Sequence, residues 1–184
     1  MTVRSFQKKH PTVPASAFVD ETALVIGDVT IGEDSSIWPM TVLRGDVHSI
    51  TVGSRTNIQD GSVVHVTSDS EHNPGGFATV IGDDITVGHR AIVHACTVGN
   101  FCLIGMGAVI MDGAVIGDHS IIGAGSLVPS GKQLEGGYLY LGSPVKRVRA
   151  LNDEEKALLA YSAEHYVRLK NTHMECNRSG EDQE

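Results

Sequence analysis

An aliphatic residue returns at nearly every sixth position along most of the chain, and this period constrains the fold more than any other feature of the sequence. It runs from Val13 to Val128, with three extra residues before Val52, a long insertion after Val64 and one step of five residues to Val98. The strands of a sandwich, whose side chains alternate every two residues, would not keep a six-residue phase over this length. The aliphatic positions are Val13, Val19, Val25, Ile31, Ile37, Leu43, Val52, Ile58, Val64, Ile81, Val87, Val93, Val98, Ile104, Ile110, Ile116, Ile122 and Val128.

A six-residue unit suits a short strand followed by a tight corner. Three such units close one triangular coil, in which the aliphatic side chains fill the interior. Small residues such as Ala91, Ala108 and Ser126 come four positions after the aliphatic ones, where the wall of the coil must bend. Coils stacked about 4.8 Å apart pair each backbone group with the coil above or below. We therefore expect an all-β solenoid of the parallel β-helix type.

The period also divides the chain into segments. Beyond the repeats, Asn152 or Asp153 can cap a helix that has acidic residues in its first turn and basic residues near its end. The expected segments are a lead-in at 1–12, the β-helix at 13–131 with a loop insertion at about 66–80, a turn-rich connection at 132–151, a C-terminal α-helix at 152–171 and a flexible tail at 172–184.

Composition excludes several classes of partner. The formal net charge of −8 disfavours nucleic acid. No apolar run has the length of a membrane span, and the charged N-terminal stretch has no apolar segment behind it, so we expect neither a membrane segment nor a secretory signal. Three irregularly spaced cysteines argue against a disulfide scaffold and suit a cytoplasmic protein.

Three histidines lie within the apolar repeat, one or two residues after an aliphatic position. Counting the units in threes puts Val64 and Val93 on the same face of the prism, and the residue after each, His65 or His94, points outward. These two side chains would lie one rung apart, close enough to reach a single ion. His89 falls on the adjacent face near a corner, and Asp60 stacks beneath it.

Two interpretations of the histidines stay open at this point. They can be hydrogen-bonded surface or interface residues. Alternatively, three prisms can pack side by side so that His89 of one copy meets His65 and His94 of the next. Three histidines with an open fourth position describe a catalytic zinc site, and such a site can equally hold Fe or Co.

The motifs around these residues resemble a known family. The stretch LRGDVHSITVGSRTNIQDGSVVHV, followed by ITVGHRAIVHACTVGN, is similar to γ-class carbonic anhydrase-like proteins of the YrdA-type subgroup, and the similarity covers nearly the whole chain. It implies a left-handed β-helix, a homotrimer, one metal ion per subunit interface, and reversible hydration of CO2 to bicarbonate by a lyase.

The resemblance also assigns residues. His65 and His94 match the metal ligands of one subunit, and His89 matches the ligand from its neighbour. Gln59 matches a glutamine that orients the reacting oxygen. The remaining matches are Asn57 and Asp60 in its polar surroundings, Arg44 and Asp46 in an interface ion-pair network, and Tyr166 as an aromatic residue over the site.

The chain departs from the family pattern where protons must leave. Archetypal γ enzymes carry a glutamate directly after the RxD motif, and Val47 occupies that position here. They carry another glutamate in an acidic loop, where Asp69, Glu71 or His72 are the possible substitutes in this chain. Each catalytic cycle must export a proton, so the lack of these two glutamates is compatible with a weak or absent CO2 hydration activity.

Two other functions remain compatible with the repeats. Many left-handed β-helices transfer acyl groups from CoA thioesters, with a histidine base and no three-histidine metal site. A trimer could also bind a metal or a siderophore without catalysing a reaction.

Overall fold

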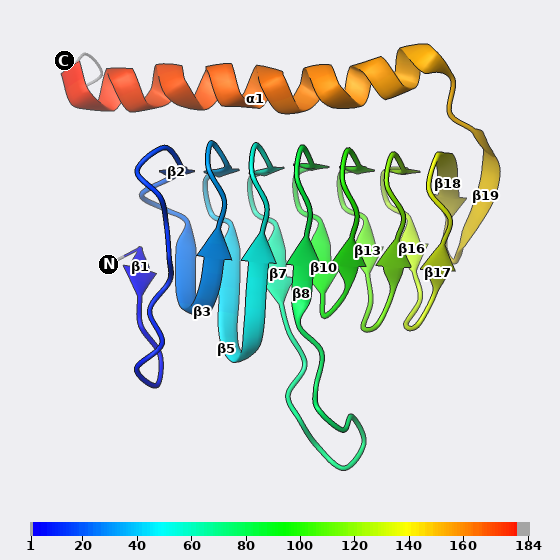
Figure 1. Ribbon diagram of the computed structural model, residues 1–184, viewed down its shortest axis with the longest axis horizontal. Helices are drawn as coiled ribbons and strands as arrows, with labels where there is room; N and C mark the ends of the chain where they lie inside the picture. Colours follow the sequence, from blue (N-terminus) through cyan, green and yellow to red (C-terminus); the bar gives the residue numbers. More distant parts are fainter. Residues whose placement is uncertain (1, 180–184) are drawn as a thin grey trace.

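The computed structural model describes residues 2–179 as a triangular prism with a long helix laid along it (Figure 1). The strands are β1 (Val3–Arg4), β2 (Phe18–Val19), β3 (Leu24–Ile31), β4 (Ser36–Ile37), β5 (Val42–Val52), β6 (Asn57–Ile58), β7 (Val63–His65), β8 (Thr79–Ile81), β9 (Thr86–Val87), β10 (Ile92–His94), β11 (Thr97–Val98), β12 (Leu103–Ile104), β13 (Val109–Ile110), β14 (Val115–Ile116), β15 (Ile121–Ile122), β16 (Leu127–Val128), β17 (Gln133–Leu134), β18 (Tyr138–Gly142) and β19 (Val145–Ala150), and the helix is α1 (Asp153–Ser179).

The three faces of the prism follow from the pairing of these strands. The first face contains β7, β10, β13 and β16, and the second contains β8, β11, β14 and β17. The long strands β3 and β5 bend from the first face into the second, which joins both faces in one sheet. The third face is a separate sheet in the order β19-β18-β15-β12-β9-β6-β4-β2. Apart from the final β18–β19 pair, every named pair of neighbouring strands is parallel, so the predicted β-helix is confirmed, and its hexapeptide repeats fit the left-handed form.

The interior is built from the aliphatic positions of the repeat. From Val25 to Val128, every one of these side chains is at least 98% buried, whereas Val13 and Val19 are partly buried at the open end. They stack in register from coil to coil, as Leu43 on Val64 and Val64 on Val93 on the first face. Removal of these apolar surfaces from water is the main force that holds the coils together.

Helix α1 lies along the third face and contacts β2, β4 and β9 (Figure 1). It begins with a capping box: Asn152 Oδ1 accepts from the Glu155 backbone N–H at 2.8 Å, and the Asn152 N–H donates to the Glu155 carboxylate at 3.0 Å. Arg149 pairs with that carboxylate through two hydrogen bonds of 2.7 Å. The loop between β7 and β8 projects from the opposite side of the prism. No helix in residues 2–179 has the length and apolar composition that a membrane crossing needs.

Two of the predicted segments differ from the structure. The helix does not end near residue 171 but continues to Ser179, because its second half packs on the first coils: His173 contacts the rings of Trp38 and Phe18 at 5.1 and 5.8 Å. The prediction of a flexible tail is therefore wrong for residues 172–179, and residues 180–184 lie outside the described residues.

The turn-rich connection expected at 132–151 also contains regular structure. Strands β17 and β18 continue the coils and bury Leu134 and Tyr140, and β19 then turns back antiparallel on β18. The glycines and Pro144 that suggested turns lie between these strands or at their ends.

Candidate functional site

The two histidines expected to share a face lie next to each other on the first face of the prism. The register pairs His94 of β10 with His65 of β7, and His65 Nδ1 lies 3.1 Å from His94 Nε2. The other ring nitrogen of each histidine is bonded to a carboxylate: His65 Nε2 to Asp46 Oδ1 at 3.0 Å, and His94 Nδ1 to Asp112 Oδ1 at 2.7 Å. We call these two pairs, together with Arg44, the face group.

The surroundings of the face group favour ionised carboxylates and a neutral His65. Burial raises the pKa of Asp46, but hydrogen bonds from His65 and Arg44 outweigh it and lower that pKa below its ordinary value. Burial likewise opposes the shift at Asp112, where hydrogen bonds from Thr67 and His94 bring the net change of pKa downward. The pKa of His65 is lowered chiefly by burial, which disfavours the imidazolium.

The facing nitrogens of His65 and His94 therefore form an incomplete arrangement. Each ionised carboxylate accepts the N–H of its own histidine, so neutral rings present two lone pairs to each other. Such a contact needs a shared proton or a cation between the nitrogens. Two nitrogen ligands at about 2.0–2.1 Å from a tetrahedral ion lie roughly 3.3 Å apart, close to the spacing of this pair. The donor set fits a metal ion.

A second set of predicted residues gathers at the corner between the third and first faces. Strand β6 supplies Asn57, Gln59 follows the strand, and Asp60 follows at the turn. His89 lies at the same turn one coil further on, and its Nδ1 is bonded to Asp60 Oδ2 at 2.8 Å. Tyr166 reaches this corner from α1. We call these five residues the corner group.

Within the corner group, Asn57 and Gln59 are almost fully buried. Gln59 Nε2 donates to Asn57 Oδ1 at 3.1 Å, which leaves the Gln59 amide oxygen as the free acceptor of that side chain. Tyr166 packs edge-on against Trp38, with 5.7 Å between ring centroids. Burial raises the Tyr166 pKa and the negative charge of Asp60 adds to this rise, so the phenol stays protonated near neutral pH.

The face group and the corner group do not form one metal site within a single chain. In the described part of the chain, no three His, Cys, Asp or Glu side chains come together around one possible ion position. His65 and His94 make up two thirds of the expected ligand set, and His89, held by Asp60, lies apart from them as the repeat count predicted.

Comparisons with known proteins decide the family. The protein YrdA of Escherichia coli is 51% identical over 94% of both chains. The chain belongs to the YrdA-type subgroup of the γ-class carbonic anhydrase-like hexapeptide proteins. A mitochondrial γ carbonic anhydrase 2 of Arabidopsis thaliana is 44% identical over 94% of this chain, which spans 62% of that longer protein.

Two further comparisons support the fold of this γ-carbonic anhydrase-like protein. A family described as bacterial transferase hexapeptide (six repeats) matches residues 95–130. A crystal structure of a hexapeptide transferase family protein from Anaplasma phagocytophilum has a TM-score of 0.86 and 43% identity, and covers 93% of this chain and 97% of the other.

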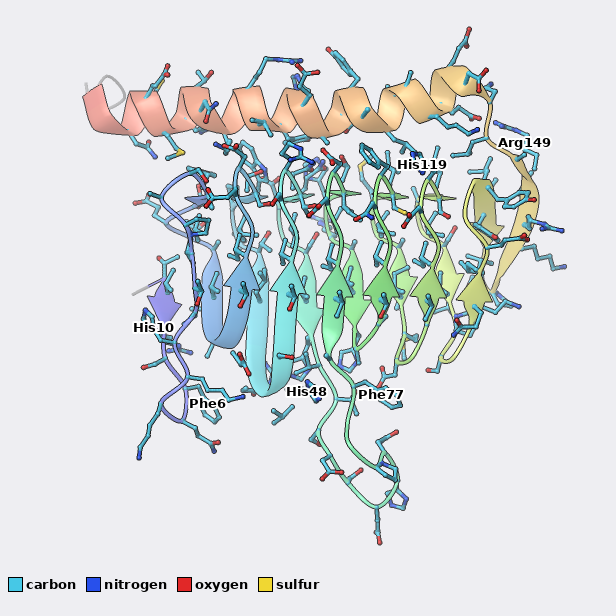
Figure 2. The ribbon with its side chains drawn as sticks, viewed as in Figure 1. Phe6, His10, His48, Phe77, His119 and Arg149 are labelled. Atoms are coloured by element: carbon cyan, nitrogen blue, oxygen red, sulfur yellow. The ribbon has the colours of Figure 1, made fainter. Side chains whose placement is uncertain are left out.

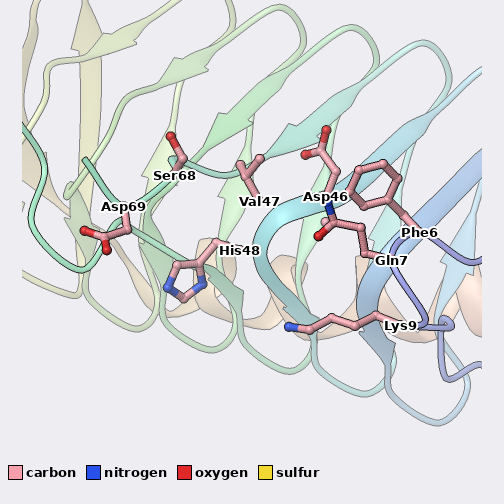
Figure 3. Close-up of a pocket in the computed structure, with 9 residues that line it drawn as sticks. Phe6, Gln7, Lys9, Asp46, Val47, His48, Ser68 and Asp69 are labelled. Atoms are coloured by element: carbon pink, nitrogen blue, oxygen red, sulfur yellow. The ribbon is translucent and has the colours of Figure 1, made fainter.

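The γ-carbonic anhydrase-like chain has a cavity of about 420 Å³ beside the face group (Figure 3). Its walls come from the N-terminal turn, the bend of β5 and the root of the β7–β8 loop, and include Asp46, Val47, His48 and Asp69. Figure 2 places His48 on the side of the prism opposite α1, near the base of that loop. Since Asp46 contacts His65, the cavity reaches the carboxylate behind a candidate ligand.

The other two loop residues expected on a proton path lie further out. Glu71 Oε1 lies 3.4 Å from His72 Nε2, and these side chains are 87% and 84% exposed. Neither of them lines the cavity beside Asp46, which Asp69 does.

Three residues of the site escaped the sequence analysis. Asp112 supports His94, and Thr67 donates to Asp112 at 2.5 Å from the root of the loop. His48 lines the cavity next to Val47. The coil count offered a signal for Asp112, because Ile110 pairs with Val93 one coil below.

Proposed function

We propose that this protein is a metal-dependent carbonic anhydrase, a lyase that interconverts CO2 and bicarbonate at the subunit interfaces of a homotrimer. The observation that carries the proposal is the pair of facing ring nitrogens 3.1 Å apart, each belonging to a histidine anchored by a carboxylate. His65 and His94 would hold the ion together with His89 of a neighbouring copy. Zinc is the first candidate, and Fe or Co are the alternatives.

Carboxylates support this role at all three histidines. A carboxylate bonded to the second ring nitrogen fixes the tautomer and orientation of a ligating histidine and raises its basicity. Asp46, Asp112 and Asp60 take this position. The third pair, Asp60 with His89, has the same chemistry as the other two, although it belongs to the corner group and not to the face group.

Exposed apolar side chains beside both groups support the trimer. On the first face, Val63 and Ile92 adjoin the two histidines and are 39% and 40% exposed, and at the corners Met40 and Met106 are exposed still more. A cluster of large apolar side chains next to polar groups is typical of a protein interface. A second copy that laid its corner group on this face would cover them and complete the ligand set.

The chain's own residues would orient the reactants. When bound, the metal would act as a Lewis acid that brings the pKa of a bound water near 7. The Gln59 amide oxygen would accept a hydrogen bond from the reacting water, since Asn57 already holds the amide nitrogen. Tyr166, kept protonated by burial, would donate to the oxygens of CO2 or bicarbonate.

The proton released in each cycle needs a route to solvent that does not use a glutamate at position 47. We propose that it leaves through the cavity that Asp46, His48 and Asp69 line, with Glu71 and His72 as the outer exchange point on the loop. An imidazole exchanges protons near neutral pH, which a valine cannot do.

The deciding experiment measures CO2 hydration by stopped flow on protein whose metal content has been counted, once with Zn and once with Fe under anaerobic conditions. Turnover that tracks metal content and disappears in His89→Ala supports the proposal. Full metal occupancy without turnover would overturn it and favour a trimer that binds a metal or a siderophore. Thermal protection of the metal-free protein by acetyl-CoA would favour an acyltransferase, the alternative suggested by the hexapeptide transferase relatives.

A further inference from the structure

We propose that helix α1 sets the orientation of Gln59 through a largely buried chain of hydrogen bonds, which makes Ser162 and Thr86 positioning residues for this side chain. Ser162 lies on the helix, and Thr86 is the first residue of β9. The catalytic meaning of the inference rests on the proposed function, in which Gln59 orients the reacting water. The hydrogen-bond chain itself can be tested without any turnover.

The chain runs without a break from the helix to the corner. Ser162 Oγ lies 2.8 Å from Thr86 Oγ1, Asn57 Nδ2 donates to Thr86 Oγ1 at 3.0 Å, and Gln59 Nε2 donates to Asn57 Oδ1 at 3.1 Å. Thr86, Asn57 and Gln59 are between 93% and 99% buried. Among these three side chains water cannot easily replace a lost partner, so an unmade hydrogen bond there is costly. Ser162, at the helix end of the chain, is partly exposed.

The direction of these bonds is fixed by one backbone carbonyl. Asn57 Nδ2 also donates to the Ile85 carbonyl at 3.1 Å. If the Asn57 amide were turned over, its oxygen would face that carbonyl oxygen and repel it. Asn57 Oδ1 must therefore point at Gln59, and Thr86, which accepts from Asn57, has its own hydroxyl proton free to donate to Ser162. Hydrogen bonds aligned in this way polarise and strengthen one another.

Two contacts beyond Ser162 hold the helix against the prism. The Lys170 ammonium is 99% buried and pairs with Asp34 at 2.9 Å. Tyr166 lies against Trp38, one turn of the helix beyond Ser162. A helix fixed at these points cannot rotate Ser162 away from Thr86 without breaking the ion pair of the buried Lys170, so the helix acts as a rigid support for the amide of Gln59.

The test compares two variants of Ser162 in the full-length protein. In Ser162→Ala, loss of one neutral hydrogen bond should speed hydrogen exchange of the Asn57 and Gln59 side-chain amides roughly tenfold, as followed by NMR on labelled protein. Ser162→Thr keeps a hydroxyl and should restore slow exchange. Thr172→Ala, which removes an exposed hydroxyl elsewhere on α1, is the control for a general loosening of the helix and should change nothing.

The outcomes separate this inference from the proposed function. Unchanged amide exchange in Ser162→Ala overturns the inference whether or not the protein hydrates CO2. Faster exchange, together with a roughly tenfold lower kcat and an unchanged KM, supports the inference and its role in turnover. If the wild-type protein has no turnover, faster amide exchange in Ser162→Ala still supports the hydrogen-bond chain, and only the proposed catalytic function is overturned. If Ser162→Ala does not fold, Thr86→Val removes that link together with the bond from Asn57 in a side chain of equal shape, and unchanged exchange in that variant is equally contradictory.

Discussion

His65 Nδ1 and His94 Nε2 face each other across 3.1 Å, while the opposite nitrogen of each ring is held by a carboxylate. Two side chains 29 residues apart in the sequence therefore direct the ring nitrogens that no carboxylate holds to one point in space. Neutral imidazoles would repel in this arrangement, and a cation between them turns the repulsion into coordination.

Loss of any of the three histidines should remove the metal. His65→Ala and His94→Ala each delete one ligand from the first face, and His89→Ala should have the same effect because its side chain would complete the site of a neighbouring copy. We expect metal content to fall at least tenfold in each variant, measured by elemental analysis after gel filtration. His119→Ala is the matched control, since His119 stacks on Phe101 and belongs to neither group. Full metal content in His89→Ala would contradict the shared interface.

Asp112→Asn should weaken metal binding without removing a ligand. The carboxylate that fixes His94 becomes an amide, which accepts a weaker hydrogen bond and can present an N–H instead. Loss of such a supporting group typically costs 10–100-fold in metal affinity. Competition with a chelator of known affinity measures the change, and Glu164→Gln on the exposed side of α1 is the control. An affinity equal to that of the control would show that Asp112 has only a structural role.

His48→Asn and Asp69→Asn should slow proton export. We expect kcat to fall about tenfold or more in dilute buffer, because general acid–base groups contribute about 10²–10⁴-fold where they operate. KM should stay the same, since neither residue is proposed to contact CO2. Concentrated buffer should restore kcat by carrying the proton itself. A kcat that is low at every buffer concentration would place the effect in the chemical step and not in proton transfer.

Acid should destabilise the helix cap in a definite range of pH. The guanidinium of Arg149 and the backbone N–H of Asn152 lower the pKa of Glu155 from 4.5 to about 2. The folded state then binds fewer protons than the unfolded state between these values, so stability is retained above about pH 4.5 and falls as the pH drops towards 2. Urea unfolding at about pH 5 and pH 3 should show a smaller loss in Glu155→Gln than in the wild type. Equal losses would mean that the cap does not contribute to acid sensitivity.

The prism could be predicted from the sequence because the six-residue period is repeated in every coil. Val64 and Val93 had to stack once the units were counted in threes, and the outward direction of His65 and His94 followed. The same count placed Asp60 beneath His89. Inferences of this kind need only the spacing of residues and the geometry of one repeating unit.

Features that depend on contacts between distant segments were missed. The coil count places Asp112 one coil from His94, but Asp112 follows Ile110 by two residues at a corner, where the direction of its side chain depends on the turn and not on the period. The helix was expected to stop near residue 171 because basic residues there suit a helix C-terminus, yet Lys170 is buried against Asp34 and His173 packs on Trp38. Only the folded prism provides those partners.

Strand β19 has a consequence for the behaviour of the protein at high concentration. A solenoid of parallel coils ends in a row of unpaired backbone groups, onto which the first coil of another molecule could add, as in the growth of a fibre. The third sheet ends instead in an antiparallel strand whose six residues include Lys146, Arg147 and Arg149. A reversed strand offers the wrong hydrogen-bonding pattern to a parallel coil. The hairpin therefore ends the repeat at a fixed length and protects the sheet from end-to-end aggregation.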